Sequence, residues 1–279
     1  MGRNAIQDIL NRFVKLIIPP RQRRPYGPVG RRNQKNGTVQ TDGAYDDEYC
    51  FWPPQMGIIV ITIIQVIFFV IDQTTDSDDI KIGTGKIAEI FIYDPLKKKE
   101  VWRFLTYMFV HVRYVHIITN AVVQLTIGFP LESVHKWWRV LIIYFLGVIA
   151  GSLLTSVIEP NVKLAGASGG VYAILTAHIA TVIMNFKDMS YGCVHLGIIL
   201  TAITVDVGSF IYYRYTKTLD VTVGYAAHFA GALVGLLVGI WILRNIDPTK
   251  KEKYLWWGAL LIYIVLMVVL IVLTTDIWL

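Results

Sequence analysis

Seven long apolar segments follow a polar start. Residues 255–273 form a run of 19 without a charged side chain. Residues 221–243 form a run of 23 without Asp, Glu, Lys or Arg, in which His228 is the one side chain that could become charged near neutral pH. Helices of such length can cross about 30 Å of hydrocarbon. The pattern therefore predicts an all-α polytopic membrane protein with a transmembrane domain over residues 54–275, whose spans we place at 54–71, 107–129, 138–158, 167–186, 192–213, 221–243 and 255–275.

Composition and charge support a membrane protein rather than a nucleic-acid-binding one. The chain is 54% hydrophobic and 16% charged, with a mean hydropathy of +0.52, which is too apolar for an ordinary soluble domain. The net charge is +6, but nine of the 26 Lys and Arg residues precede residue 36 and many others flank apolar segments. This asymmetry favours a cytosolic N-terminus, with residue 168 near the opposite face of the membrane.

Residues 1–53 are basic, then acidic, and are expected to form a largely disordered cytosolic tail. Residues 6–18 fit either a short amphipathic helix on an anionic membrane surface or a chance pattern. The two cysteines, Cys50 and Cys193, imply neither a disulfide framework nor a metal site. We predict no metal and no cofactor.

A small-residue stretch with a serine, Gly166-Ala167-Ser168-Gly169-Gly170, opens the fourth apolar segment. Such residues commonly let transmembrane helices pack closely, and on these five residues alone packing is the better interpretation. Glycines around a serine also let a substrate backbone approach its hydroxyl. The polar residues of two other segments decide between these interpretations.

Polar side chains are concentrated in the second segment. His116 and Asn120 are four residues apart and share one helix face, and His111 lies nearer the outer surface. They could be interhelical hydrogen-bonding residues, or a pair of donors aimed at one point. In the sixth segment, His228 lies within a stripe of glycines spaced for close helix contact, Gly224, Gly231, Gly235 and Gly239.

Together these residues can form a Ser–His dyad. A serine hydroxyl needs a base to take its proton, and His228 could be that base for Ser168. His116, Asn120 and the Ser168 amide could stabilise the oxyanion. Asp206 could orient His228 only if the fifth span faces the site, and we expect it instead to be a hydrogen-bonded packing residue.

The chain resembles the rhomboid family of intramembrane serine proteases over roughly residues 55–275. Four motifs carry the resemblance: Trp102-Arg103, His111-x4-His116-x3-Asn120, Gly166-Ala167-Ser168-Gly169 and Ala227-His228-x2-Gly231-x3-Gly235. The seventh span and the basic tail are similar to the animal secretase-type members. The family has a six-helix core, and the additional span here would be C-terminal.

The resemblance implies a role for each matching residue. Ser168 would be the nucleophile and His228 the base, with oxyanion support from His116 and Asn120. Gly166 would keep the turn compact, and Tyr172 would pack on the catalytic histidine. Structural roles are implied for His111, Trp102, Arg103, Glu132, Gly231 and Gly235.

The resemblance also implies the partners and the location. Substrates would be single-pass membrane proteins, including precursors of EGF-like growth factors, cleaved in or beside their transmembrane segment within the lipid bilayer of the Golgi or plasma membrane. The site would face the lumen or outside, and no nucleic acid would be bound. The rival interpretations are a catalytically inactive rhomboid-like protein that binds clients, and a seven-span receptor or transporter. Neither the zinc-protease pattern H-E-x-x-H nor a GxGD-type pair of aspartates occurs in the sequence.

Overall fold

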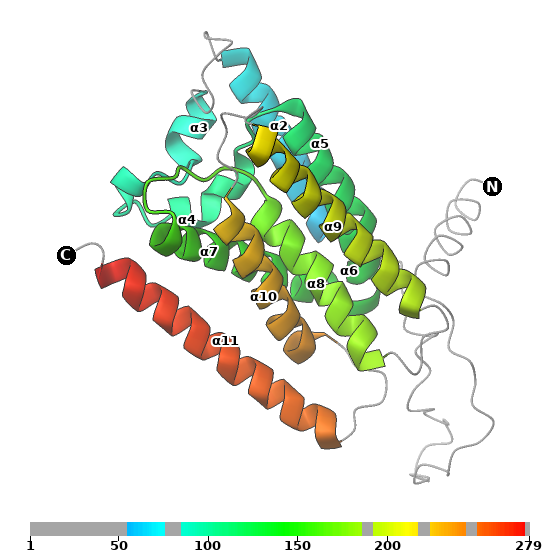
Figure 1. The fold of residues 1–279 in the computed structure, drawn as a ribbon. Coiled ribbons are helices and arrows are strands. Elements are labelled where there is room, and N and C mark those ends of the chain that lie inside the picture. The colour runs from blue at the N-terminus through cyan, green and yellow to red at the C-terminus, as the bar shows by residue number, and fades with distance from the viewer. Residues whose placement is uncertain (1–54, 76–84, 186–191, 217–223, 244–249, 277–279) are drawn as a thin grey trace, which may run out of the picture.

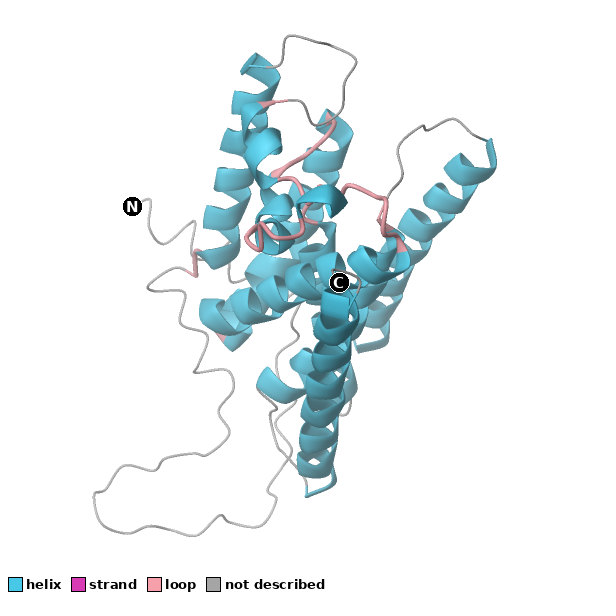
Figure 2. Cartoon of the chain, turned by 90° about the vertical axis from the view of Figure 1, so that its left-hand side faces the viewer, coloured by secondary structure: helices cyan, strands magenta, loops and turns pink. Residues whose placement is uncertain are grey.

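A computed structural model describes residues 55–75, 85–185, 192–216, 224–243 and 250–276 of the 279-residue chain. This part of the chain is built almost entirely of helices (Figures 1 and 2). The expectations for the tail at residues 1–53, including the amphipathic pattern at 6–18 and Cys50, lie outside the described residues.

Six helical spans in the described residues are long and apolar enough to cross a membrane. They are α2 (Gly57–Thr75), a composite second span (Tyr114–His135), α7 (Trp137–Ile158), α8 (Ser168–Asn185), α10 (Tyr225–Ile242) and α11 (Lys250–Asp276). The remaining long helix, α9 (Gly192–Thr216), has a shorter apolar part, Leu196–Gly208. The all-α polytopic architecture is thus confirmed, with α9 differing from the other six in the length of its apolar stretch.

The second span begins later than the sequence suggested. We placed its start at residue 107, but its first helix, α5 (Tyr114–Val123), begins seven residues further on. It continues through a π-helical turn, η4 (Gln124–Gly128), into α6 (Phe129–His135). Residues assigned to the start of this span instead form the short helices α4 (Arg103–Thr106) and η3 (Tyr107–Phe109). Tyr107 and Met108 are buried, so their apolar character reflects packing against protein rather than lipid.

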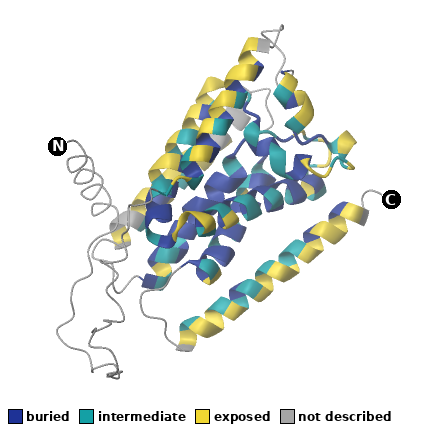
Figure 3. Cartoon of the chain, turned by 180° about the vertical axis from the view of Figure 1, so that it is seen from behind, coloured by how far each residue is buried: buried dark blue, intermediate teal, exposed yellow. Residues whose placement is uncertain are grey.

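The core lies where α7, α8 and α10 meet. Of the six spans, α8 is the most buried and α11 the least. Figure 3 shows the buried residues gathered in the interior and α11 largely exposed. The helix α11 packs against α7 and α10 at the edge of the bundle, where the hydroxyls of Ser156 and Thr274 are 2.8 Å apart. The helix α9 packs against α8.

A ring of buried hydrogen bonds holds α2 to the second span and α7. The Gln124 side-chain amide donates to Thr62 Oγ1 (2.6 Å) and Gln65 Oε1 (3.0 Å). The Tyr144 hydroxyl donates to Gln124 Oε1 and accepts from Gln65 Nε2, both at 2.9 Å. Gln124 lies in the π-helical turn, so the irregular part of this span coincides with its main polar contact.

Within α6, Glu132 fixes the start of α2. Its Oε1 accepts a hydrogen bond from the Ile58 amide at 2.8 Å, and its side chain is fully buried. An amide in the first turn of a helix has no partner within that helix, so this carboxylate supplies one.

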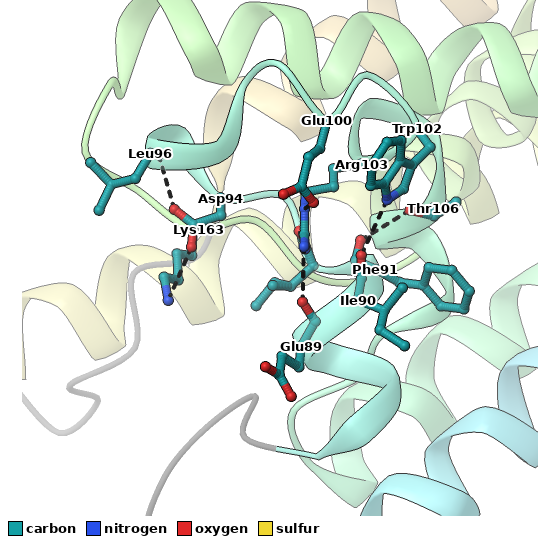
Figure 4. Close-up of polar contacts among 11 residues, drawn as sticks. Glu89, Ile90, Phe91, Asp94, Leu96, Glu100, Trp102, Arg103, Thr106 and Lys163 are labelled. Carbon is teal, nitrogen blue, oxygen red and sulfur yellow. Dashed lines mark hydrogen bonds and ion pairs between the residues drawn. The ribbon is translucent and has the colours of Figure 1, made fainter.

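The loop between α2 and α5 is folded around Arg103 (Figure 4). Its guanidinium donates to Glu100 Oε2 (2.7 Å), Ile92 O (2.8 Å) and Glu89 O (3.0 Å). The Trp102 indole donates to Ile90 O at 3.3 Å. Trp102 and Arg103 thereby join α4 to α3 (Lys86–Phe91), which precedes it in the loop.

The same loop is paired with the segment that precedes α8. Tyr93 and Leu164 exchange two backbone hydrogen bonds of 3.0 Å in an antiparallel bridge. Beside this bridge, Lys163 Nζ lies 3.4 Å from Asp94 Oδ2. Leu164 is four residues before Ser168, so the loop is connected directly to the approach to α8.

Candidate active site

The stretch that contains Ser168 forms the start of α8. Ser168 is the first residue of this helix and is partly exposed, whereas Gly169 and Gly170 are buried. The segment just before the helix is fixed by a hydrogen bond from the Gly166 amide to Tyr107 O at 3.1 Å. Ser168 therefore lies at the partly exposed end of a buried helix.

Gly166 is required by its backbone conformation and by its neighbour. Its φ of 114° lies in the region that residues with a side chain rarely adopt. A Cβ at this position would also lie 2.6 Å from Nε2 of His116. The turn before Ser168 therefore lies directly against the His116 ring.

The helices α8 and α10 touch at backbone distance along a contact that we call the α8–α10 seam. A Cβ on Gly231 would overlap the carbonyl oxygen of Gly169, and one on Gly235 would overlap that of Ala173. Further along, a Cβ on Gly239 would lie 2.9 Å from Ala177 Cα. The glycines of α10 thus occur where the backbone of α8 leaves no room for a side chain.

The seam brings the surroundings of Ser168 and His228 together. A Cβ on Gly169, the residue after Ser168, would lie 3.6 Å from the carbonyl oxygen of Ala227, the residue before His228. No hydrogen bond joins the Ser168 hydroxyl to His228 within the described part of the chain. The two residues are therefore on touching helices at the same level, without a direct bond in this structure.

The His228 ring is held by aromatic contacts. It stacks on the Tyr172 ring with centroids 4.6 Å apart and an interplanar angle of 18°, and the Tyr225 ring approaches it edge-on at 6.1 Å. Tyr172 follows Ser168 by one helical turn. The α8 helix therefore carries both the hydroxyl and the ring that supports the imidazole.

The donors expected on α5 also face this region. Asn120 is buried, and its side-chain Nδ2 has no hydrogen-bond partner among the described residues. One turn earlier, His116 contacts the Gly166 turn, and the ring of His111 packs edge-on against that of His116 at 5.2 Å. A buried amide without a partner is costly unless it serves a ligand, so Asn120 is suited to donate to a bound group.

We expected Asp206 to be a hydrogen-bonded packing residue on a span that does not face the site; it is hydrogen-bonded, but it lies at the site. Its Oδ2 accepts a 2.5 Å hydrogen bond from the Tyr172 hydroxyl and lies 3.8 Å from His228 Nδ1. The sequence showed a carboxylate within an apolar helix but not the direction in which α9 turns it, because α9 has no clear apolar stripe to fix its orientation.

No group of three or more His, Cys, Asp or Glu side chains arranged to hold a metal ion occurs among the described residues. Ser168, His228, Asn120 and His116 carry side chains of the kinds that can act as nucleophile, base and oxyanion donors in acyl transfer.

Comparison with known proteins agrees with the fold. The Rhomboid domain model matches residues 98–245. Rhomboid-related protein 1 of Caenorhabditis elegans is 39% identical over 79% of this chain and 64% of its own length. Rhomboid-related protein 2 of Mus musculus is 36% identical over 76% of this chain and 72% of its own length.

The names of further relatives differ in what they say of activity. A relative from Caenorhabditis elegans that is 31% identical over 75% of this chain and 60% of its own length is named inactive rhomboid-related protein 2. A more distant one from Toxoplasma gondii, 24% identical over 70% of this chain and 69% of its own length, is named rhomboid-like protease 2. From the domain match and the similarity across most of its length, the chain belongs to the rhomboid family.

Proposed function

We propose that this chain is an intramembrane serine protease in which Ser168 is the nucleophile and His228 the general base. The observation that carries the proposal is the α8–α10 seam, since the backbone contact between Gly169 and Gly231 holds both residues at one level. A receptor or transporter would need no serine and histidine at such a contact. Relatives named proteases support the same activity.

The reaction would proceed by acyl transfer. His228 takes the proton of the Ser168 hydroxyl as the oxygen attacks a peptide carbonyl carbon, and then gives that proton to the leaving amine. Water then attacks the ester formed on Ser168, and His228 again transfers the proton. His228 Nδ1 is the nitrogen nearer Asp206, which leaves Nε2 to exchange the proton with Ser168. Catalytic hydrogen bonds of this kind often tighten only when substrate is bound.

The carbonyl oxygen of the substrate becomes negatively charged during the attack. The Asn120 amide, the His116 ring and the Ser168 backbone N–H are the donors that would stabilise it. Asn120 is the best supported of them, because its buried Nδ2 has no protein partner in the described residues. A donor fixed in advance stabilises the transition state without reorganisation.

The substrate would be the transmembrane or juxtamembrane segment of a single-pass membrane protein. Such a segment must leave its helical form locally, because a helix hides the carbonyls that the serine must reach. With a cytosolic N-terminus, the start of α8 would face the lumen or the outside, and we place the enzyme in the Golgi or plasma membrane. Precursors of EGF-like growth factors are candidate substrates.

A fluorophosphonate probe tests the nucleophile without knowledge of the substrate. Full-length protein in detergent should label, and Ser168→Ala and His228→Ala should each abolish labelling. Ser133→Ala is a matched control, because within the described residues the Ser133 hydroxyl bonds only a carbonyl of its own helix, Phe129 O at 2.9 Å. Equal labelling of wild type and Ser168→Ala would remove Ser168 from the mechanism.

Co-expression with a panel of single-pass membrane proteins then tests proteolysis. Cleavage by wild type that is lost in Ser168→Ala would support the proposal. If the folded wild type neither labels nor cleaves, but captures the same membrane proteins as Ser168→Ala, it would instead resemble the relative named inactive.

A further inference from the structure

Asp206 is the only acidic residue of α9. A carboxylate in a helix that borders lipid is costly and usually has a functional partner. The side chain of Asp206 is half exposed, at 49%, whereas that of His228 is 16% exposed. The carboxylate thus lies at the edge of the candidate site, with one oxygen directed into it.

Three side chains from three helices form one cluster, which we call the Asp206 cluster. Tyr172 of α8 donates its hydroxyl to Oδ2 of Asp206 on α9, and its ring stacks on His228 of α10. The same Oδ2 lies 3.8 Å from His228 Nδ1. One carboxylate oxygen is therefore near both the imidazole and the ring that supports it.

We propose that Asp206 is a positioning residue that holds the His228 imidazole in the orientation required for proton transfer. It would act directly across Nδ1 and indirectly by fixing the Tyr172 ring on which His228 is stacked. This inference rests on the proposed function, since it assigns a role to a neighbour of the proposed base.

The ring nitrogen of His228 that lies near Asp206 supports this role. In a serine–histidine–aspartate arrangement, the carboxylate faces Nδ1, keeps Nε2 turned to the serine, and stabilises the imidazolium that forms during the reaction. Here the carboxylate lies on the Nδ1 side as well. The separation of 3.8 Å is longer than a hydrogen bond, so the direct contact is electrostatic, and the Tyr172 hydroxyl provides the bonded connection.

A purely structural role would be to anchor α9 on α8. Apolar contacts already supply such an anchor, because Ile199 of α9 is 2% exposed and belongs to the main hydrophobic core, against which Ile203 also packs. Asp206 is more exposed than either residue. The two roles differ in outcome, since loss of an anchor lowers the melting temperature, whereas loss of positioning lowers kcat in a protein that remains folded.

Kinetics of the full-length protein test the proposal. Asp206→Asn keeps the shape of the side chain and removes its charge. We expect it to lower kcat and the rate of fluorophosphonate labelling by about tenfold or more, with KM within about twofold of wild type. Asp206→Glu, which restores a carboxylate, should recover part of the loss.

Tyr172→Phe tests the bonded connection. It removes the hydroxyl but keeps the stacked ring, and we expect a smaller loss of kcat. The double variant Asp206→Asn/Tyr172→Phe should lose less than the product of the two single effects, because both residues act on the same imidazole and Asp206 acts on it partly through Tyr172. Thr204→Val is the matched control on α9, since, in the part of the chain that the structure describes, the Thr204 hydroxyl bonds only Leu200 O of its own helix, at 2.7 Å.

Each outcome has a distinct meaning. An unchanged kcat in Asp206→Asn, with wild type active and Ser168→Ala inactive, would overturn the role of Asp206 and leave the proposed function intact. A lower melting temperature in Asp206→Asn with normal kcat for the folded fraction would make Asp206 an anchor and also overturn it. A wild type that behaves as Ser168→Ala in labelling and cleavage would overturn both proposals.

Discussion

Gly231 of α10 lies against the carbonyl group of Gly169 of α8 with no space for a side chain between them. The contact joins backbone to backbone, so neither helix can move aside by changing a rotamer. Any atom added to Gly231 must push α10 away from the helix that carries Ser168.

Gly231→Ala should therefore lower both stability and activity. We expect a loss of about 1–3 kcal/mol in the free energy of unfolding, as for other overpacked sites, together with a large fall in fluorophosphonate labelling. Gly258→Ala is the matched control, because a Cβ at Gly258 of α11 would meet no atom of the described residues within 4 Å. Thermal unfolding in detergent measures the first effect, and equal melting temperatures for the two variants would contradict the prediction.

Asn120→Ala should slow cleavage while the fold remains intact. Removal of one oxyanion donor costs about 10²–10³ in kcat in subtilisin-type serine proteases. Because Asn120 Nδ2 has no partner among the described residues, its loss breaks no hydrogen bond of that part of the fold. Thr119→Ala, which alters an exposed neighbour on the same helix, is the control. Cleavage by Asn120→Ala at the wild-type rate would exclude Asn120 from the oxyanion role.

Gln124→Leu should destabilise the protein through the partners that it leaves behind. The variant removes hydrogen bonds to Thr62, Gln65 and Tyr144, all of them buried. Each unsatisfied buried group costs about 1–3 kcal/mol. The double variant Gln65→Leu/Gln124→Leu should lose less free energy of unfolding than the two single variants lose together, because it removes both members of one hydrogen-bonded pair. Additive losses in unfolding experiments would show that the ring does not act as a unit.

His111 should make stability depend on pH. Burial and the neighbouring His116 lower the pKa of His111 from 6.5 to about 3. The unfolded chain then binds a proton below pH 6.5 that the folded chain rejects until about pH 3. The contribution of His111 to the free energy of unfolding is therefore fully present above pH 6.5. It falls by about 1.4 kcal/mol per pH unit as the pH decreases from 6.5 to about 3.

The measurement is the melting temperature of wild type and His111→Asn between neutral and mildly acidic pH. Other buried histidines contribute to both proteins, so the difference between the two curves isolates His111. We expect wild type to lose more stability than the variant on acidification. Parallel curves would contradict the shift in the His111 pKa.

The sequence was informative where spacing alone sets a contact. The glycines of α10 recur at four-residue intervals, from Gly231 through Gly235 to Gly239, which on a helix defines one face, and that face is the α8–α10 seam. It was less informative for the first loop, where buried residues such as Met108 have the same composition as residues in lipid. The sequence did not predict that Asp206 faces the site, because the rotation of α9 depends on packing against residues distant in the chain. The π-helical turn at Gln124 likewise gave no signal in the spacing of apolar residues.

The bridge between Tyr93 and Leu164 makes the first loop mechanically continuous with the peptide that leads to Ser168. A strain applied to the loop from outside would be transmitted along a few backbone bonds to Ser168, the proposed nucleophile. A force on the loop would thus reach Ser168 without any molecule entering the site.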